Sequence, residues 1–470
     1  VGTLIGVLPG IGSLATIAML LPITFGLPPV GALIMLAGIY YGAQYGGSTT
    51  AILVNIPGEA ASVVTCLDGY QMARQGRAGP ALAIAAIGSF FAGTVCTLII
   101  AMFGPPLAEM ALKFGAPEYF SLMLMGLVMA AVLAGDDITK ALAMVVMGLL
   151  LGIVGTDVNS GMARYSFGVP ELTDGIGFIV IAVGVFAVGE IVSNLGETEE
   201  RKVFTSKVTG LMPTVKDLKA SFWPIVRGTG LGAFLGVLPG TGPAIASFSS
   251  YMLEKKLAKD PSRFGKGAIE GVAGPESANN ADAQCKFIPT LTLGIPASAV
   301  MALMLGALTI QGIAPGPQVM TQKPDLFWGL VASMWIGNLM LVLLNLPLIG
   351  LWVSLLKVPY RLLFPAIMAF SCIGIYSVNN SAFELYLTAI FGIIGLVWMR
   401  LGMPPAPMLL GFVLGPLMEE NLRRALLISR GDPTVFFTRP ISLGFMIVTG
   451  LIVVVMVLPA VKARRAAMTG

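Results

Sequence analysis

The sequence predicts an all-α polytopic membrane protein with about 10–12 transmembrane helices or half-helices, arranged as two structural repeats with broken helices. Two observations indicate the membrane class. Only 11% of the 470 residues are charged, and the first 58 residues contain no charged side chain. A third observation indicates the repeat, because Gly6-Val-Leu-Pro-Gly-Ile-Gly12 returns as Gly236-Val-Leu-Pro-Gly-Thr-Gly242.

Long charge-free runs continue through the rest of the chain. A helix needs roughly 20 apolar residues to cross a bilayer, and several runs are long enough for one crossing or nearly two. The runs after the first 58 residues are 78–108, 119–135, 228–253, 287–322, 326–356, 362–383, 401–418 and 440–461. They predict crossings along the whole chain, which opens inside an apolar segment, so we expect an N-terminal piece to precede it.

Composition excludes several function classes. The net charge of +4 is spread over loops, which gives no nucleic-acid-binding surface. The chain contains no histidine, the commonest metal ligand and general base. Its four scattered cysteines form no metal-ligand pair and predict small apolar residues. No nucleophile elbow or zinc-protease signature is present, so we expect no enzyme, no metal site and no cofactor.

Weaker matches follow the first repeat in the same order. Asn55-Ile-Pro57 corresponds to Gly294-Ile-Pro296, Ser89–Gly93 to Ser333–Gly337, and Leu-Leu-Gly152 to Leu-Leu-Gly411. The separation only grows along the chain, as insertions in loops would produce. We therefore predict a first repeat at 1–195, a polar linker at 196–222 and a second repeat at 223–470. Inverted and parallel repeats both remain open.

Broken helices at the repeated segments predict the substrate site. Proline and glycine break a helix, and a break at membrane depth is tolerated only beside protein or a water-filled cavity. The half-helix that follows points its positive dipole end and free amides at that cavity, which suits a carboxylate. Small polar residues before the second breaks could bind a carboxylate together with Na⁺. The predicted substrate-binding residues are Pro9, Gly10, Gly12, Ser48, Thr49, Thr50, Asn55, Pro57, Gly58, Pro239, Gly240, Thr241, Gly242, Asn279, Asn280, Gly294, Pro296 and Ser298.

Ionisable residues near the spans are candidates for coupling to a cation gradient. Asp282 and Glu276 are the best candidates, and Glu59 and Glu190 are weaker ones. Cationic side chains are scarce there, with Lys286 as one candidate partner for the substrate. A multivalent anion would then be neutralised mainly by helix dipoles and by co-transported Na⁺ or H⁺.

Orientation is not settled by the positive-inside rule. Arg74, Arg77, the run Lys255–Lys266 and the run Arg423–Arg439 should face the cytoplasm. The basic tail that begins at Lys462 follows one further apparent span, so both ends of that span cannot lie inside.

At its repeated segments the chain resembles the large membrane subunit of the bacterial tripartite tricarboxylate transporters, over essentially the whole length. The matching stretches are Gly6–Gly12, Tyr40–Thr50, Asn55–Glu59, Asp68–Arg74, Gly236–Gly242, Pro275–Asn280 and Leu291–Pro296. Ala297 stands where a second glycine is expected. The resemblance implies an ion-driven secondary transporter in the bacterial inner membrane. It also implies two partners, a small membrane subunit and a periplasmic solute-binding protein that delivers carboxylates such as citrate.

Three alternatives remain. A stand-alone ion-coupled organic anion exchanger would need no partner. An intramembrane enzyme would need one of the missing signatures, and a channel would more commonly be a short symmetric oligomer than a long duplicated chain.

Overall fold

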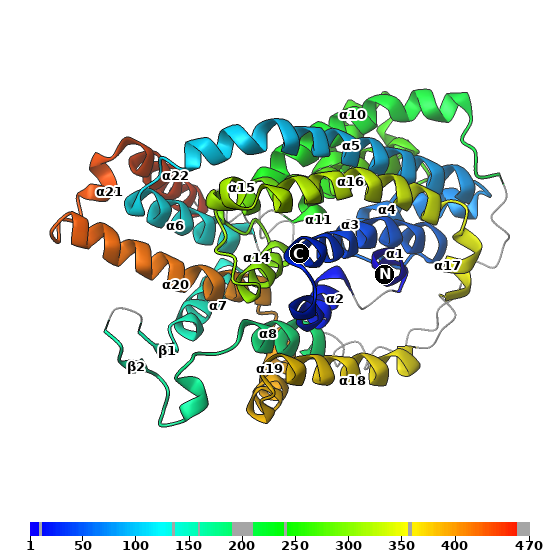
Figure 1. The fold of residues 1–470 in the computed structure, drawn as a ribbon. Helices are drawn as coiled ribbons and strands as arrows, with labels where there is room; N and C mark the ends of the chain where they lie inside the picture. The colour runs from blue at the N-terminus through cyan, green and yellow to red at the C-terminus, as the bar shows by residue number, and fades with distance from the viewer. Residues whose placement is uncertain are drawn as a thin grey trace.

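The computed structural model describes residues 1–8, 12–133, 137–157, 160–189, 210–238, 242–355 and 360–457, and these residues are mainly helical (Figure 1). The first half contains α1 (Gly2–Val7), α2 (Gly12–Leu20), η1 (Leu21–Gly26), α3 (Pro29–Val54), η2 (Ala60–Ser62), α4 (Val63–Arg74), α5 (Ala78–Ala111), α6 (Ala116–Leu133), α7 (Ile138–Gly152), β1 (Gly155–Thr156), β2 (Ala163–Arg164), η3 (Pro170–Leu172), α8 (Phe178–Ile181) and η4 (Ala182–Val188). β1 and β2 pair antiparallel as a two-stranded ribbon.

The second half repeats the helical plan at greater length. It contains α10 (Val215–Val237), α11 (Pro243–Leu257), η5 (Pro261–Arg263), α12 (Glu270–Cys285), α13 (Phe287–Leu293), α14 (Ala299–Ile310), α15 (Gln318–Gln322), α16 (Pro324–Asn345), α17 (Ile349–Leu355), α18 (Tyr360–Asn379), α19 (Ala382–Arg400), α20 (Pro405–Ile428), α21 (Val435–Thr438) and α22 (Pro440–Val457).

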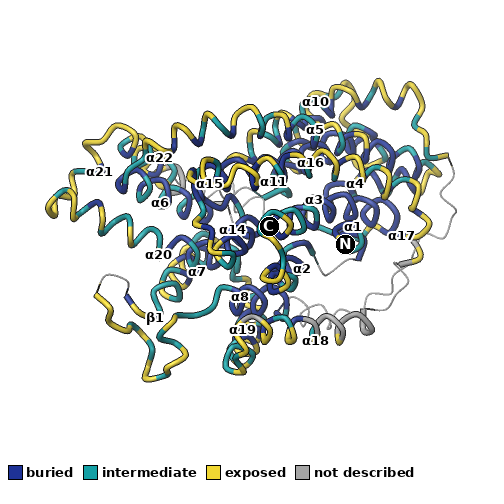
Figure 2. Tube along the Cα trace, viewed as in Figure 1, coloured by how far each residue is buried: buried dark blue, intermediate teal, exposed yellow. Residues whose placement is uncertain are grey.

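The membrane class is confirmed by helices that carry apolar side chains on the outside. Among the described residues, α5, α16 and α19 are long and apolar enough to cross a bilayer, and several shorter apolar helices accompany them. Large apolar residues such as Phe103, Ile336 and Ile393 are exposed on these three helices. At the centre of the molecule, by contrast, the side chains of α3 and α14 are mostly buried, as Figure 2 shows. The exposed apolar side chains are solvated by lipid, whereas water would not solvate them.

The same close packing occurs at the start of both halves. A Cβ on Gly6 would lie 2.1 Å from the Ala43 carbonyl oxygen, and one on Gly236 would lie 2.6 Å from the Asp282 carbonyl oxygen. α1 therefore lies directly on α3, and α10 lies in the same way on α12. Glycine is needed because no side chain fits between these backbones. The repeated motif thus encodes a repeated helix pair.

The matched helices α5 and α16 run antiparallel. Gly93 of α5 packs against Asn338 of α16, and Gly104 packs against Phe327, so contacts move backwards along α16 as they move forwards along α5. Under the predicted correspondence of Ser89–Gly93 with Ser333–Gly337, this antiparallel direction favours the inverted arrangement of the two repeats. The limits of the two repeats remain a sequence prediction.

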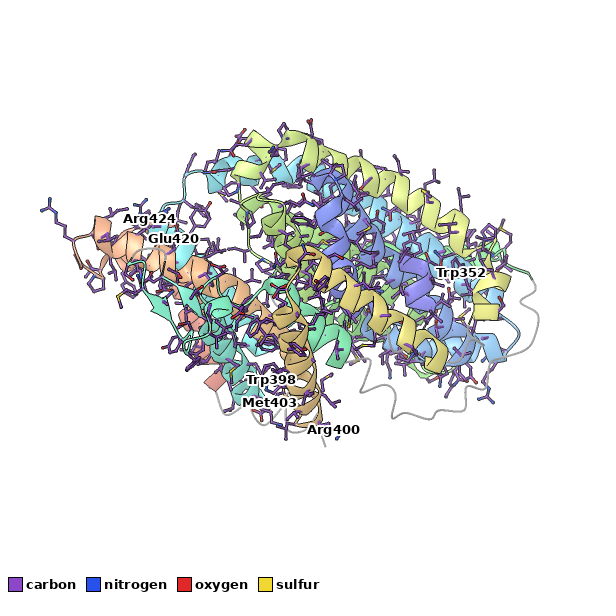
Figure 3. The ribbon with its side chains drawn as sticks, turned by 60° about the horizontal axis from the view of Figure 1, so that its bottom comes forward. Trp352, Trp398, Arg400, Met403, Glu420 and Arg424 are labelled. Atoms are coloured by element: carbon purple, nitrogen blue, oxygen red, sulfur yellow. The ribbon has the colours of Figure 1, made fainter. Side chains whose placement is uncertain are left out.

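Two of the three basic groups, the one that contains Arg77 and the one that ends at Arg439, lie at opposite ends of α5. Arg77 precedes its first residue, whereas the Glu118–Arg439 ion pair follows its last, at 2.5 Å. Thirty-four residues of helix span about 50 Å. The expectation that both groups face the cytoplasm is therefore wrong for one of them. Figure 3 shows Glu420 and Arg424 near one end of the molecule and Trp352 near the other.

Candidate functional site

In both halves the helix before the Ile-Pro pair ends in the same backbone conformation. Asn55 ends α3 with φ of 59°, and Gly294 ends α13 with φ of 71°, so both residues are left-handed. Asparagine and glycine are the residues that adopt this conformation most readily. The predicted second breaks, each followed by Ile-Pro, are confirmed.

The first breaks are also reproduced where the structure describes them. α1 ends at Val7 and α2 begins at Gly12, whereas α10 ends at Val237 and α11 begins at Pro243. The Thr50 hydroxyl donates to the Val7 carbonyl oxygen at 3.1 Å, which satisfies a group that the break frees. Five predicted substrate-binding residues lie outside the described residues, as does Glu190. The five are Pro9, Gly10, Pro239, Gly240 and Thr241.

Close packing holds the loop after Asn55 against the first half. A Cβ on Gly58 would lie 1.9 Å from the Gly6 carbonyl oxygen and 2.7 Å from Cα of Gly47. The equivalent residue of the second half, Ala297, is fully buried without needing to be glycine. Gly58 is thus a packing residue, because the Gly6 carbonyl oxygen and the Gly47 backbone leave no room for a side chain there.

Gly58→Ala should lower the yield of folded protein several-fold, because the added methyl group overlaps a backbone oxygen that cannot move independently. Size-exclusion chromatography of the detergent-extracted protein measures this yield. The matched control is Gly444→Ala, where a new Cβ meets nothing within 4 Å. Equal yields for both variants would contradict the assigned packing.

α12 carries a row of polar side chains into the protein interior. Every residue from Gly271 to Cys285 is buried. The Asn280 amide donates to the Ser89 hydroxyl at 2.7 Å, and the Gln284 amide donates to Asn338 at 3.0 Å. Both atoms of the neighbouring Asn279 amide are buried and have no hydrogen-bond partner among the described residues. Such a polar row belongs to a functional path more readily than to a packing core.

Two carboxylates on α12 have different surroundings. Glu276 accepts hydrogen bonds from the Ser48 hydroxyl at 2.5 Å and from the Thr65 hydroxyl, so it links α12 of the second half to α3 and α4 of the first. Asp282 instead forms a 2.5 Å ion pair with Lys286, and both side chains are 0% exposed. Glu276 is therefore held by neutral hydroxyl groups, and Asp282 by a cation.

A cavity of about 440 Å³ lies where the broken segments of the two halves meet. Its wall includes the starts of α2 and α11 and the residues that follow both second breaks. The polar or backbone-exposing residues in the wall are Ser13, Tyr40, Gln44, Glu59, Gly242 and Ser298. The volume is in the usual range for small-molecule sites, about 300–1,000 Å³. Helix starts from both halves therefore face one space.

Only a few of the predicted substrate-binding residues line this cavity. Gly242 and Ser298 line it, whereas Ser48 and Thr49 line a separate space of about 20 Å³ between α3 and α5. The remaining described ones form the breaks or the buried polar row and do not line this wall. They are Gly12, Thr50, Asn55, Pro57, Gly58, Asn279, Asn280, Gly294 and Pro296. Ser13, Tyr40 and Gln44 also line the cavity, although the sequence did not predict them as substrate-binding residues. The position of Ser13, directly after the repeated motif, was the signal that could have found it.

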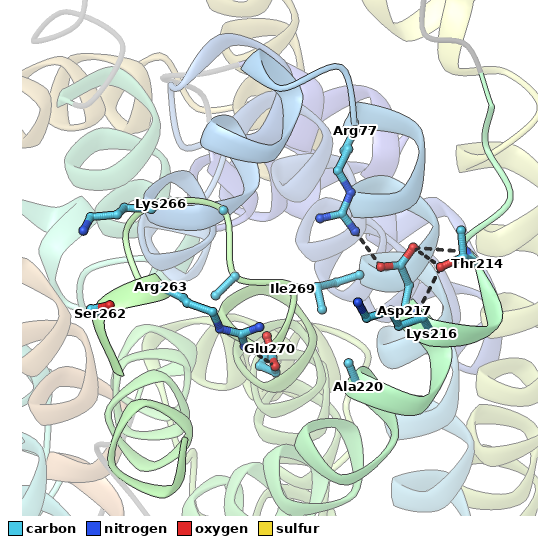
Figure 4. Close-up of a pocket in the computed structure, with 12 residues that line it drawn as sticks. Arg77, Thr214, Lys216, Asp217, Ala220, Ser262, Arg263, Lys266, Ile269 and Glu270 are labelled. Carbon is cyan, nitrogen blue, oxygen red and sulfur yellow. Dashed lines mark hydrogen bonds and ion pairs between the residues drawn. The ribbon is translucent and has the colours of Figure 1, made fainter. Parts of the chain in front are cut away.

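A second cavity, of about 570 Å³, lies at the end of the molecule where α5 and α10 begin (Figure 4). Arg77 pairs with Asp217 and Arg263 pairs with Glu270, each at 2.5 Å. Burial acts to raise the pKa of Asp217, but the hydrogen bonds from Thr214 and the Arg77 charge outweigh it and hold that pKa below its usual value. The Arg77–Asp217 pair fastens the end of the polar linker to the loop before α5, whereas the Arg263–Glu270 pair lies within the second half.

Two helical halves with broken helices that meet at a shared cavity define a multi-pass membrane transport protein. The sequence profile of the Tripartite tricarboxylate transporter TctA family matches residues 1–410. The chain belongs to this family, and is therefore a tricarboxylate transporter subunit that works with partner subunits.

Two proteins of Agrobacterium vitis are similar to this chain. One, described as an uncharacterized 52.8 kDa protein in the TAR-I ttuC′ 3′ region, is 60% identical over 464 residues, which are 99% of this chain and 92% of that protein. The other, an uncharacterized protein in the TAR-II ttuC′ 3′ region, is 61% identical over 234 residues, which are 50% of this chain and 97% of that protein. No solved structure matches the chain.

Proposed function

We propose that this subunit imports a tricarboxylate or related organic acid across the bacterial inner membrane, driven by a Na⁺ or H⁺ gradient. A periplasmic binding protein delivers the acid, and a small membrane subunit completes the complex. The observation that supports this proposal is the 440 Å³ cavity faced by the starts of α2 and α11. Helix N-termini attract carboxylates through their dipoles and unpaired amides.

The substrate carboxylates bind, in this proposal, to groups contributed by both halves. The α11 start offers the Ala244 amide, and Ser298 offers a hydroxyl group. The Pro-Gly residues at both first breaks keep the binding role proposed from the sequence. Because the two halves each supply part of the wall, a rocking motion of one half against the other would open the cavity to alternate sides.

Cation coupling is proposed for the carboxylates of α12. Glu276 is the stronger candidate, since two hydroxyl groups and a carboxylate are hard oxygen ligands of the kind that Na⁺ binds, and the same group can take up a proton. Asp282 already has Lys286 as a counter-ion at 2.5 Å, so it would couple only if that pair opens. No other cofactor is proposed.

Reconstitution tests the dependence on partners. A chain with short loops has little surface to capture scarce substrate, and a binding protein raises the local concentration at the cavity. In proteoliposomes with an imposed Na⁺ or H⁺ gradient, we expect negligible citrate uptake by this subunit alone. Uptake should appear with the small subunit and loaded binding protein, and it should saturate with the binding protein's concentration. Full-rate uptake by the isolated chain would favour the stand-alone exchanger.

A further inference from the structure

The carboxylate of Glu59 lies at the start of α2. The Ser13 backbone N–H, at the first turn of α2, donates to Oε1 of Glu59 at 2.5 Å. The backbone of Glu59 is fixed in turn by Ser62, whose hydroxyl donates to the Glu59 carbonyl at 2.8 Å and accepts from its N–H at 3.2 Å. A carboxylate is thus held at the kind of helix terminus that a substrate carboxylate would seek.

The second half lacks this arrangement. Ser298 follows Gly294 by the same number of residues as Glu59 follows Asn55, and both residues begin the next helix and line the cavity. In the first-break repeat, Ser13 corresponds to Pro243, which has no N–H to donate. The carboxylate is therefore present only in the half where a backbone donor faces it.

No cation lines the described wall of the cavity. Glu59 and Tyr40 are its titratable members, and Tyr40 lies within electrostatic range of both Glu59 and Asp282 of α12. Asp282 is neutralised by Lys286. An incoming anion therefore meets one negative charge at Glu59, and like charges repel strongly in a site of low dielectric constant.

Charged residues on the other helices next to η2 face other partners. Glu254 of α11 pairs with Arg227 at 2.5 Å, and Asp68 of α4 accepts from the Tyr251 hydroxyl at 2.9 Å. Lys255 and Lys256 lie in the last turn of α11, about three turns from the start that lines the cavity, and Arg74 lies in the last turn of α4. None of them lines the cavity.

Gln44 supplies an independent sign that the cavity takes a polar ligand. Its side chain lines the wall and is 2% exposed, and its amide oxygen has no hydrogen-bond partner among the described residues. Buried amide groups are normally paired, and a carboxylic acid bound in the cavity would supply donors and acceptors to this one.

We propose that the Glu59 carboxylate is a built-in competitor of the substrate, occupying the α2 start when the cavity is empty and releasing the Ser13 N–H to a substrate carboxylate. This proposal rests on the proposed function and assigns its anion site more closely. The displaced Glu59 takes one proton from solution, so that one proton enters with each substrate molecule bound. Substrate binding then depends on pH, because the substrate displaces Glu59 and Glu59 takes up a proton.

Citrate binding to the complex between about pH 7 and pH 9 tests this linkage, because citrate stays ionised over that range and one linked proton weakens binding about tenfold per pH unit. In Glu59→Gln, which keeps an acceptor for Ser13, and in Glu59→Ser, which copies the second half, the slope should vanish, and citrate should bind about a hundredfold more tightly than to the wild type at pH 9. Glu420→Gln, on the exposed face of α20, is the matched control and should behave as the wild type.

A pH-indicating dye in weak buffer gives a second readout without any variant, and wild-type protein should take up one proton per citrate bound. Absence of carboxylate binding by the wild-type complex at every pH would overturn the proposed function, and this inference with it. Citrate binding without proton uptake, or with an unchanged slope in Glu59→Gln, would overturn the inference alone.

Discussion

Asp282→Asn should destabilise the protein by about 3–5 kcal/mol, because it removes the carboxylate from an ion pair that is fully buried and leaves the Lys286 charge in place. Lys286→Met should have a similar effect for the opposite reason. The double variant Asp282→Asn/Lys286→Met should recover most of the loss, since no uncompensated charge then remains. Unfolding of the purified protein in a denaturing detergent measures all three.

The double variant also separates a structural role of this pair from a coupling role. If the pair only stabilises α12, the double variant folds and transports with unchanged ion dependence. If Asp282 couples transport to the cation, the double variant folds but loses that dependence. Additive losses in the two single variants, with no recovery in the double, would contradict the ion pair itself.

Glu276→Gln should lower citrate uptake by the reconstituted complex by about tenfold or more and should weaken its dependence on the cation gradient, because coupling free energies are about 1–3 kcal/mol. The amide keeps the size of the side chain and still accepts a hydrogen bond, so the contact with Ser48 and Thr65 survives in part. What disappears is the charge that attracts the cation.

Ser48→Ala and Thr65→Ala should each give a smaller loss than Glu276→Gln, since each removes one hydroxyl ligand and leaves the charge. Glu420→Gln serves again as the control for an exposed carboxylate. Unchanged uptake and unchanged ion dependence in Glu276→Gln would move coupling away from this carboxylate.

The sequence by itself determined the class and the breaks, and it predicted the repeat. The long charge-free runs indicate a membrane protein, because the lipid interior solvates long apolar helices and water does not. Proline and glycine break helices through local sterics, so the conformations at Asn55 and Gly294 follow from residues next to them in the chain. The Gly6 and Gly236 motifs could be matched because their residues repeat in the sequence; the structure then shows that each glycine lies at a close helix contact.

Only the tertiary structure decided which of the marked residues share a space. Glu59 and Ser13 are 46 residues apart, and Ser48 and Glu276 are 228 apart, so no local pattern relates them. The partner of Asp282 lies one helical turn away, within the reach of a spacing argument, but its complete burial depends on α10 packing over α12. The antiparallel direction of α5 and α16 likewise depends on how many crossings precede each helix. Contacts between distant segments are set by how whole helices pack, and that packing is a property of the assembled chain.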